Sequence, residues 1–277
     1  MDQARFAARR AAFRTLHESG CFIIPNPWDA GSAHALAALG FKALATTSSG
    51  HAWAHAQPDG TMGVDRVLAH CREIVEATPL PVNADFEDGY ADDLAGLKDN
   101  VRRCVETGVA ALSIEDSRHD HTLYAFDTAL ARLRAARAAI DATGQDVMLV
   151  GRTQCFITGR PDPLPEAVKR LKAFADAGAD CLYALGGQQP GQIKALVAAV
   201  APKPLNVLVG HPPAYTLADL EAWGVRRISV GGALAGAAWG GFLRAARGLA
   251  AGRFDGFADN AQHGELNHIA AQRLPTP

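Results

Sequence analysis

Three acidic side chains have the spacing of a candidate metal site. Asp85 and Glu87 are two residues apart at the end of one apolar run, and Glu115 ends the next. Because alternate side chains of a strand share one face, we expect Asp85 and Glu87 to project together, with Glu115 within reach. Carboxylates so close repel one another unless a cation lies between them, and oxygen ligands without His or Cys select a hard ion. The sequence therefore favours Mg²⁺, with Mn²⁺ as the alternative, over acids that are merely solvated.

A cation and several polar residues accompany these acids. Arg152 follows the apolar run 147–151, where a guanidinium could hold a substrate carboxylate or phosphonate through two hydrogen bonds. The competing interpretation is an ion pair with one of the acids. The small residues at 47–50 would let backbone N–H groups approach a substrate oxyanion. His119 and His121 could transfer a proton near neutral pH, although histidines in a polar loop are often simply exposed.

These residues lie on an alternation of short strands and longer helices. We predict strands at residues 22–25, 43–47, 82–86, 111–115, 147–151, 181–184, 205–209 and 226–230. Helical segments between them end in glycine, as at Gly108 and Gly178, because glycine adopts the left-handed conformation that ends a helix. Eight such units without a linker favour an α/β fold, a closed (β/α)₈ TIM-type barrel, over an open doubly wound sheet.

One domain accounts for the whole length. Residues 1–277 would form a single barrel, with an extra N-terminal helix at 4–19 and a partly helical extension after Gly252. Catalytic side chains of such barrels come from the C-terminal ends of strands. On that rim we place further candidates for substrate binding: Trp28, Thr47, Ser49, Tyr183 and Asn206.

Composition excludes several classes of function. The chain has 27 Lys and Arg against 29 Asp and Glu, with no long basic run, so neither nucleic acid nor a membrane is an expected partner. The longest wholly apolar run, residues 195–201, is far shorter than the roughly 20 residues that cross a bilayer. Five scattered cysteines form no CxxC pair, and the N-terminus offers no secretory signal. We expect a cytoplasmic protein.

The motifs together resemble the isocitrate lyase and phosphoenolpyruvate mutase superfamily. The resemblance rests on Asn26-Pro27-Trp28-Asp29-Ala30, Thr47-Ser48-Ser49-Gly50-His51, Asn83-Ala84-Asp85-Phe86-Glu87-Asp88-Gly89-Tyr90, Ser113-Ile114-Glu115-Asp116 and Gly151-Arg152-Thr153. It implies a (β/α)₈ barrel, a homotetramer built as a dimer of dimers with the C-terminal helix exchanged between neighbours, and an Mg²⁺-dependent reaction through an enolate of a 2-oxo acid.

The resemblance also implies roles for individual residues. Asp85 would bind the metal directly or through water, and Glu87 and Glu115 would act through waters. Asp59 would help to order the metal's water shell. Lying along the substrate's carboxylate and enolate oxygens would be Ser49, Gly50 and His51. Arg152 would hold a carboxylate, and Asn206 matches a polar residue at the end of the seventh strand.

The loop after the fourth strand departs from the family. The lyases carry Lys-Lys-Cys-Gly-His there, whereas this chain reads Asp116-Ser117-Arg118-His119-Asp120-His121. Cleavage of isocitrate or methylisocitrate is therefore not expected, because the Cys acid/base is missing. We expect a lyase or decarboxylase of a small 2-oxo or 2-hydroxy dicarboxylate. The alternatives are a mutase or hydrolase of the C–P bond of phosphonopyruvate or phosphoenolpyruvate, and a protein that binds 2-oxo acids without turnover.

Overall fold

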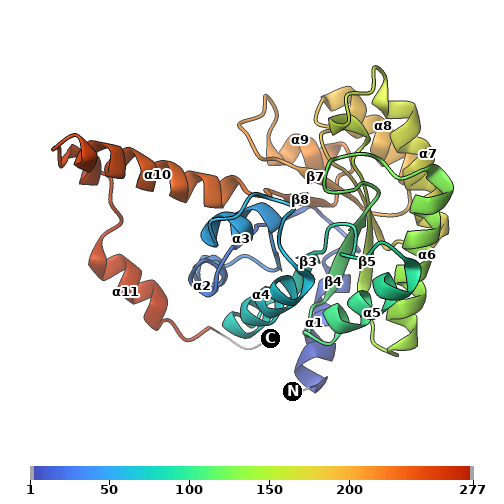
Figure 1. The fold of residues 1–277 in the computed structure, drawn as a ribbon, viewed down its shortest axis with the longest axis horizontal. Coiled ribbons are helices and arrows are strands. Elements are labelled where there is room, and N and C mark those ends of the chain that lie inside the picture. Colours follow the sequence, from blue (N-terminus) through green and yellow to red (C-terminus); the bar gives the residue numbers. More distant parts are fainter. Residues whose placement is uncertain (1–2, 275–277) are drawn as a thin grey trace.

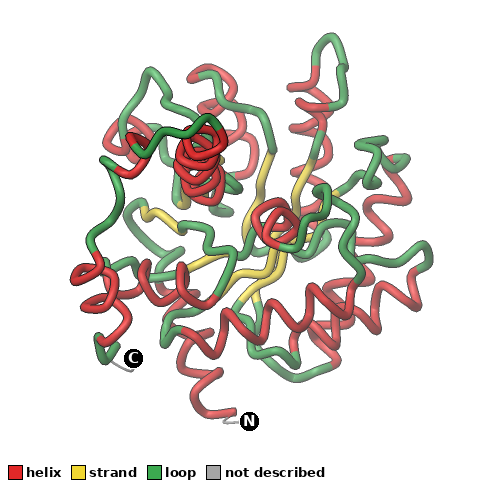
Figure 2. The backbone as a smooth tube through the Cα atoms, turned by 60° about the vertical axis from the view of Figure 1, so that its left-hand side comes forward, coloured by secondary structure: helices red, strands yellow, loops and turns green. Residues whose placement is uncertain are grey.

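Eight parallel strands form a nearly closed barrel, as predicted (Figures 1 and 2). The computed structural model describes residues 3–274. The strands are β1 (Phe22–Ile24), β2 (Leu44–Ala45), β3 (Val82–Asp85), β4 (Ala111–Glu115), β5 (Met148–Thr153), β6 (Cys181–Ala184), β7 (Leu205–Leu208) and β8 (Arg227–Ser229). From β2 to β8 each strand pairs in parallel with the next, and β8 pairs with β1, which leaves a seam between β1 and β2. The predicted (β/α)₈ fold is confirmed.

The seam between β1 and β2 is closed by hydrogen bonds outside the strands. The amide of Ala45 donates to the carbonyl of Pro25 at 3.0 Å. The Asn26 side chain donates to the carbonyl of Thr46 and accepts from the amides of Val230 and Gly231, at 2.9 Å each. One buried amide therefore ties three strand ends together at the mouth of the barrel.

Helices surround the barrel and separate the strands. They are α1 (Gln3–Thr15), α2 (Ala30–Ala38), α3 (Ser48–Ala54), α4 (Val64–Ala77), α5 (Leu94–Val105), α6 (Phe126–Ala142), α7 (Pro163–Asp176), α8 (Pro190–Val200), α9 (Leu217–Ala222), α10 (Ala233–Ala250) and α11 (His263–Ala271). The glycine predicted to follow α5, Gly108, has a φ of 92°. A side chain there would also meet the ring of Phe6 at 2.5 Å, so glycine is required for both reasons.

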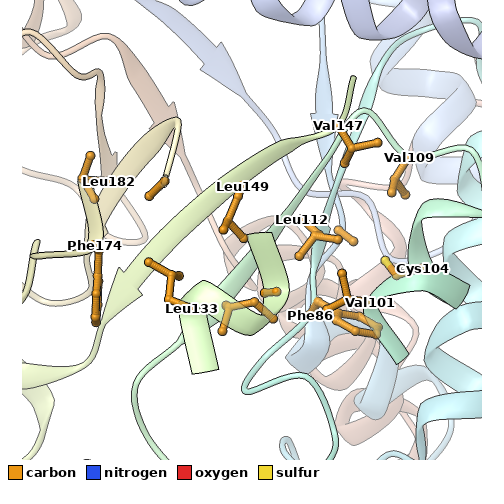
Figure 3. Packing of buried hydrophobic residues seen from close by; sticks show 14 of the residues in the cluster. Phe86, Val101, Cys104, Val109, Leu112, Leu133, Val147, Leu149, Phe174 and Leu182 are labelled. Atoms are coloured by element: carbon orange, nitrogen blue, oxygen red, sulfur yellow. The ribbon is translucent and has the colours of Figure 1, made fainter. Parts of the chain in front are cut away.

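Two layers of apolar side chains hold the sheet, since alternate strand residues face opposite sides. Leu149 and Leu182 point outward and pack with Leu133 of α6 and Phe174 of α7 (Figure 3). A second cluster, which includes Met148, fills the inside of the barrel. The inner cluster leaves the mouth to polar residues, which therefore form the walls of a cavity.

The predicted N-terminal helix closes the lower end of the barrel. Phe13 of α1 is fully buried against the inner cluster. Arg9 and Arg10 are buried as well, and their guanidinium groups donate to carbonyls of Val75 at 2.8 Å and Val109 at 3.0 Å. These carbonyls precede strands or end helices, so α1 is fixed by backbone groups that would otherwise lack partners.

The C-terminal segment leaves the barrel. Helix α10 projects outward, and α11 returns to contact α2, where His34 Nε2 lies 3.0 Å from the carbonyl oxygen of Ile269 (Figure 1). Large apolar side chains of α10, Phe242 among them, are exposed. No helix within residues 3–274 has the length and apolar character needed to cross a membrane. The single-domain prediction for 1–277 also includes residues 1, 2 and 275–277, which lie outside the described part.

Acid should destabilise the fold through His17, which lies beneath the barrel. Burial and the charge of Arg227 lower its pKa to about 3, while the unfolded chain takes up the proton near pH 6.5. Between these values the unfolded state binds more protons, so stability falls as pH falls. We expect His17 to cost about 2 kcal/mol at pH 5 relative to pH 7. Urea unfolding of His17→Gln should show that much less acid sensitivity; an unchanged dependence would contradict the assignment.

Candidate active site

A cavity of about 200 Å³ opens at the C-terminal ends of the strands. This volume suits a small metabolite, because sites for drug-sized ligands begin at about 300 Å³. Several predicted residues line it: Thr47, Ser49, Asp59, Asp85, Arg152, Tyr183 and Asn206. The structure thus gathers residues from distant parts of the chain around one small space.

Arg152 lies between two of the predicted acids. Its Nη1 is 3.1 Å from Oδ1 of Asp85 and 3.2 Å from Oε2 of Glu115. The guanidinium carbon also sits 5.2 Å from the ring centre of Tyr183. All of these side chains are largely buried, so the charges are weakly screened. Arg152 therefore neutralises part of the acidic cluster when no ligand is present.

Glu87 reaches the site by a different route from the one predicted. The third strand ends at Asp85, and Glu87 follows it with a φ of 42°, in the left-handed region that side chains other than glycine rarely adopt. The expectation that both acids share a strand face is therefore wrong. The turn, and not strand alternation, aims the Glu87 carboxylate, which lies 3.1 Å from Nδ1 of His119.

Burial and mutual repulsion keep two of the acids partly protonated near neutral pH. Burial, followed by the charge of Asp85, raises the pKa of Glu87 to about 8. Burial also raises the pKa of Glu115 to about 7, although the nearby guanidinium of Arg152 opposes the shift. The cluster thus has more acidic groups than its cations can balance.

The segment after β2 forms the wall beside these acids. Thr47 caps α3, and its hydroxyl lies 3.0 Å from that of Ser49. The amide of Ser48 donates to Oδ2 of Asp85 at 3.1 Å. Asp59 lines the cavity from the loop after α3. The predicted small-residue loop is therefore a helix N-terminus that fixes Asp85.

Three predicted substrate contacts do not line the main cavity. At Gly50, a Cβ would come within 3.0 Å of the Cβ of Trp28 and 3.1 Å of that of Ala235, so this glycine permits close packing of α3. Trp28 belongs to the same contact. His51 is buried behind the wall, stacked on His70 with ring centres 3.9 Å apart. Burial lowers the pKa of His51 to about 4, which keeps its ring neutral.

The predicted acid/base histidines occupy a loop beside the mouth. His119 and His121 line a smaller cavity of about 130 Å³, together with Asp59, Glu87, Glu115 and Arg152. The main and smaller cavities share Ser48, Asp59, Arg152 and Leu185. A bridge between Ser117 and Leu123 gives the loop a hairpin shape. This arrangement places His119 against an acid and leaves His121 without a comparable partner among the described ion pairs.

Several cavity residues were missed from the sequence. They are Thr46, Asn83, Ser113, Arg227 and Ser229, all of which line the main cavity. The sequence pattern that marks such residues is polar side chains at alternate positions of an apolar strand. Asn83 and Asp85 in β3 show it, as do Arg227 and Ser229 in β8. Such inward positions belong to the site whenever the barrel interior is open.

The donor chemistry fits a hard cation, but the acids are not gathered around a vacant point. Across the described residues, no three His, Cys, Asp or Glu side chains converge as a ready metal site. Arg152 contacts two of the acids directly. Mg²⁺ commonly uses few direct protein ligands and keeps several waters, so Asp85 with outer acids is a suitable set.

The chain is similar to several known proteins. The family model for phosphoenolpyruvate phosphomutase matches residues 13–250. A candidate lyase/mutase from Burkholderia cenocepacia J2315 has a similar structure, with a TM-score of 0.92, 41% identity and coverage of 97% of this chain and 98% of that one. The 2,3-dimethylmalate lyase of Eubacterium barkeri is 28% identical, over 73% of this chain and 72% of its own length. An oxaloacetate decarboxylase of Paraburkholderia xenovorans LB400 is also 28% identical, over 79% and 74%.

Replacing Glu87 should stabilise the ligand-free protein in a pH-dependent way. The folded protein retains the Glu87 proton up to about pH 8, whereas the unfolded chain loses it near pH 4.3. Ionisation therefore lowers stability as pH rises through this window. Glu87→Gln should gain at least about 1 kcal/mol at pH 8 relative to pH 5. Urea unfolding measures this, with exposed Glu76→Gln as control; equal behaviour of the two variants would refute the buried-acid assignment.

Proposed function

Because this chain belongs to the phosphoenolpyruvate phosphomutase family and is an enzyme of the wider isocitrate lyase superfamily, we propose that it is an Mg²⁺-dependent lyase or decarboxylase. The substrate would be a small 2-oxo or 2-hydroxy dicarboxylate. The observation that carries the proposal is the contact of Arg152 with Asp85 and Glu115 at the wall of a small polar cavity.

The relatives' names support the substrate class. Dimethylmalate and oxaloacetate are both dicarboxylates with an oxygen at the second carbon, and their enzymes align with most of this chain. A cavity of about 200 Å³ with Arg152 on its wall suits such a molecule. The match to the phosphoenolpyruvate phosphomutase family keeps C–P chemistry as the alternative, and an assay with phosphonopyruvate separates the two.

The residues around the cavity can be given roles in this reaction. Arg152 would exchange its contacts with Asp85 and Glu115 for a substrate carboxylate. Mg²⁺, held by Asp85 with Asp59, Glu87 and Glu115 acting through waters, would supply positive charge near the 2-oxo oxygen. Ser49 would orient the substrate from the wall formed by the segment after β2, where its hydroxyl lies 3.0 Å from that of Thr47. Differential stabilisation of the enolate, relative to the bound substrate, lowers the barrier.

Proton transfer is assigned to the loop after β4. His119 lies 3.1 Å from the Glu87 carboxylate, and both line the smaller cavity that adjoins the mouth. The pair can hold one proton between an imidazole and a carboxylate, the arrangement needed for general acid/base work. This pair would take the place of the Cys of the lyases.

Assembly into a homotetramer is part of the proposal. Phe242, Leu243 and Leu249 of α10 are exposed, with 59% of the Phe242 surface accessible. A helix that leaves its own barrel with such side chains uncovered is suited to packing on a neighbouring subunit. We propose that α10 is exchanged between neighbours in a dimer of dimers.

A substrate panel tests the function. Oxaloacetate and 2,3-dimethylmalate should be turned over with MgCl₂ and not after EDTA treatment. Asp85→Asn should reduce turnover at least about 100-fold, because it weakens the metal's charge partner, whereas Asp99→Asn on exposed α5 should not.

Faster release of pyruvate from phosphonopyruvate would instead indicate C–P chemistry. Binding of oxaloacetate without product would indicate a binding protein. Undiminished Mg²⁺-dependent turnover by Asp85→Asn would refute the metal assignment.

The assembly has its own test. Light scattering of the purified protein should give the mass of four chains. Phe242→Asp should lower that mass by placing a charge in the apolar contact. Lys98→Asp, a change on another helix, serves as the control for the added charge. A wild-type mass of one chain would contradict the exchanged helix.

A further inference from the structure

A second arginine faces the main cavity and has no role in the proposed reaction so far. Arg227 is the first residue of β8, points into the barrel and is only 4% exposed. Its strand, β8, precedes α10. Strand β1 and the seam separate β8 from β2 and from β3, which carries Asp85. A buried guanidinium on a cavity wall is a candidate anion-binding group.

The strand register places Arg227 deeper than Arg152. One row of paired residues runs across the sheet from Arg152 through Tyr183 and Asn206 to Arg227. Strands of such barrels tilt by about 36°, so a row perpendicular to them changes height around the barrel. Arg152 is next to the last residue of β5, whereas Arg227 begins β8. The row therefore descends from the mouth to the floor of the cavity.

The partners of Arg227 are neutral. Its Nε donates to Oδ1 of Asn206 at 2.8 Å, and its Nη1 donates to Oδ1 of Asn83 at 3.3 Å. None of the ion pairs found among residues 3–274 includes Arg227, whereas Arg152 contacts two acids. The amides orient the guanidinium but leave its charge uncompensated.

Within the described residues, apolar side chains and a neutral histidine lie beneath Arg227, so a counter-charge would come from the cavity side. On the floor, apolar side chains such as Phe13, Ile24 and Met148 fill the inside of the barrel. His17 below them stays neutral at physiological pH. A buried charge without a partner is costly, so an anion that enters the cavity gains a strong, weakly screened contact.

We propose that Arg227 determines specificity for dicarboxylates by binding the second carboxylate of a substrate whose other end faces Arg152. This inference rests on the proposed function for the identity of the substrate class. The two ends of the cavity then differ in charge. Acids that can hold a metal ion lie at the mouth, and the guanidinium of Arg227 lies at the floor without an acidic partner. Monocarboxylates would leave the Arg227 charge unmatched and would bind less tightly.

Calorimetry with unreactive probes tests the assignment. Malonate and succinate are each compared with their half-amides, malonamate and succinamate, which replace one carboxylate by a neutral group of similar shape. We expect the wild-type protein to prefer each dianion by roughly 10- to 100-fold, the range of a charged hydrogen bond. Arg227→Gln should remove this preference, and Arg227→Lys should retain part of it. Arg226→Gln is the matched control, since the neighbouring side chain bonds outside the barrel to Gly20.

The outcomes separate this inference from the proposed function. A folded Arg227→Gln that keeps the wild-type preference would overturn the inference, even if the lyase assay succeeds. Loss of the preference in that variant alone supports it, even if no turnover is found. Where the Arg227 variants fail to fold, a crystal structure of the wild-type protein with malonate decides. A carboxylate hydrogen-bonded to Arg227 supports the assignment, and malonate bound without that contact overturns it.

Discussion

The balance of buried charge at the mouth of the barrel is the constraint on which the site depends. Asp85, Glu87 and Glu115 lie close together out of water, and Arg152 contacts two of them. Burial raises the pKa of Glu87 and of Glu115, so these acids carry a cost that the fold must offset. A group of this kind is neutralised either by protonation or by a cation, from a side chain or from a bound metal.

Rigid supports hold that charge in place. Asp116, next to Glu115, accepts hydrogen bonds from Thr153 at 2.7 Å and from the Gln154 amide at 2.9 Å, and it pairs with Arg170 at 3.1 Å. These buried contacts join the ends of β4 and β5, which carry Glu115 and Arg152. Because each partner is satisfied, the network fixes the strand ends while leaving the carboxylates of the site free for a ligand.

Strand alternation explains why the cavity is polar and polarised. In β4, Leu112 and Ile114 pack outward, whereas Ser113 and Glu115 face the interior. The same period of two directs Arg227 inward from β8. Since Asp85 and Glu115 end their strands and Arg227 begins its own, the acids gather at the mouth of the cavity and an unpaired positive charge lies at its floor. A dipolar site of this form suits a metal and an elongated anion together.

The sequence by itself determined the eight strands, the glycine-ended helices and the grouping of Asp85, Glu115 and Arg152, because these follow from local periodicity and from the common rim of parallel strands. Tertiary structure alone decided the turn that aims Glu87, the position of Gly50 and His51 behind the cavity wall, and the depth of Arg227 in the barrel. Those features depend on backbone dihedrals and on register between distant segments. Residue type and spacing do not encode them locally.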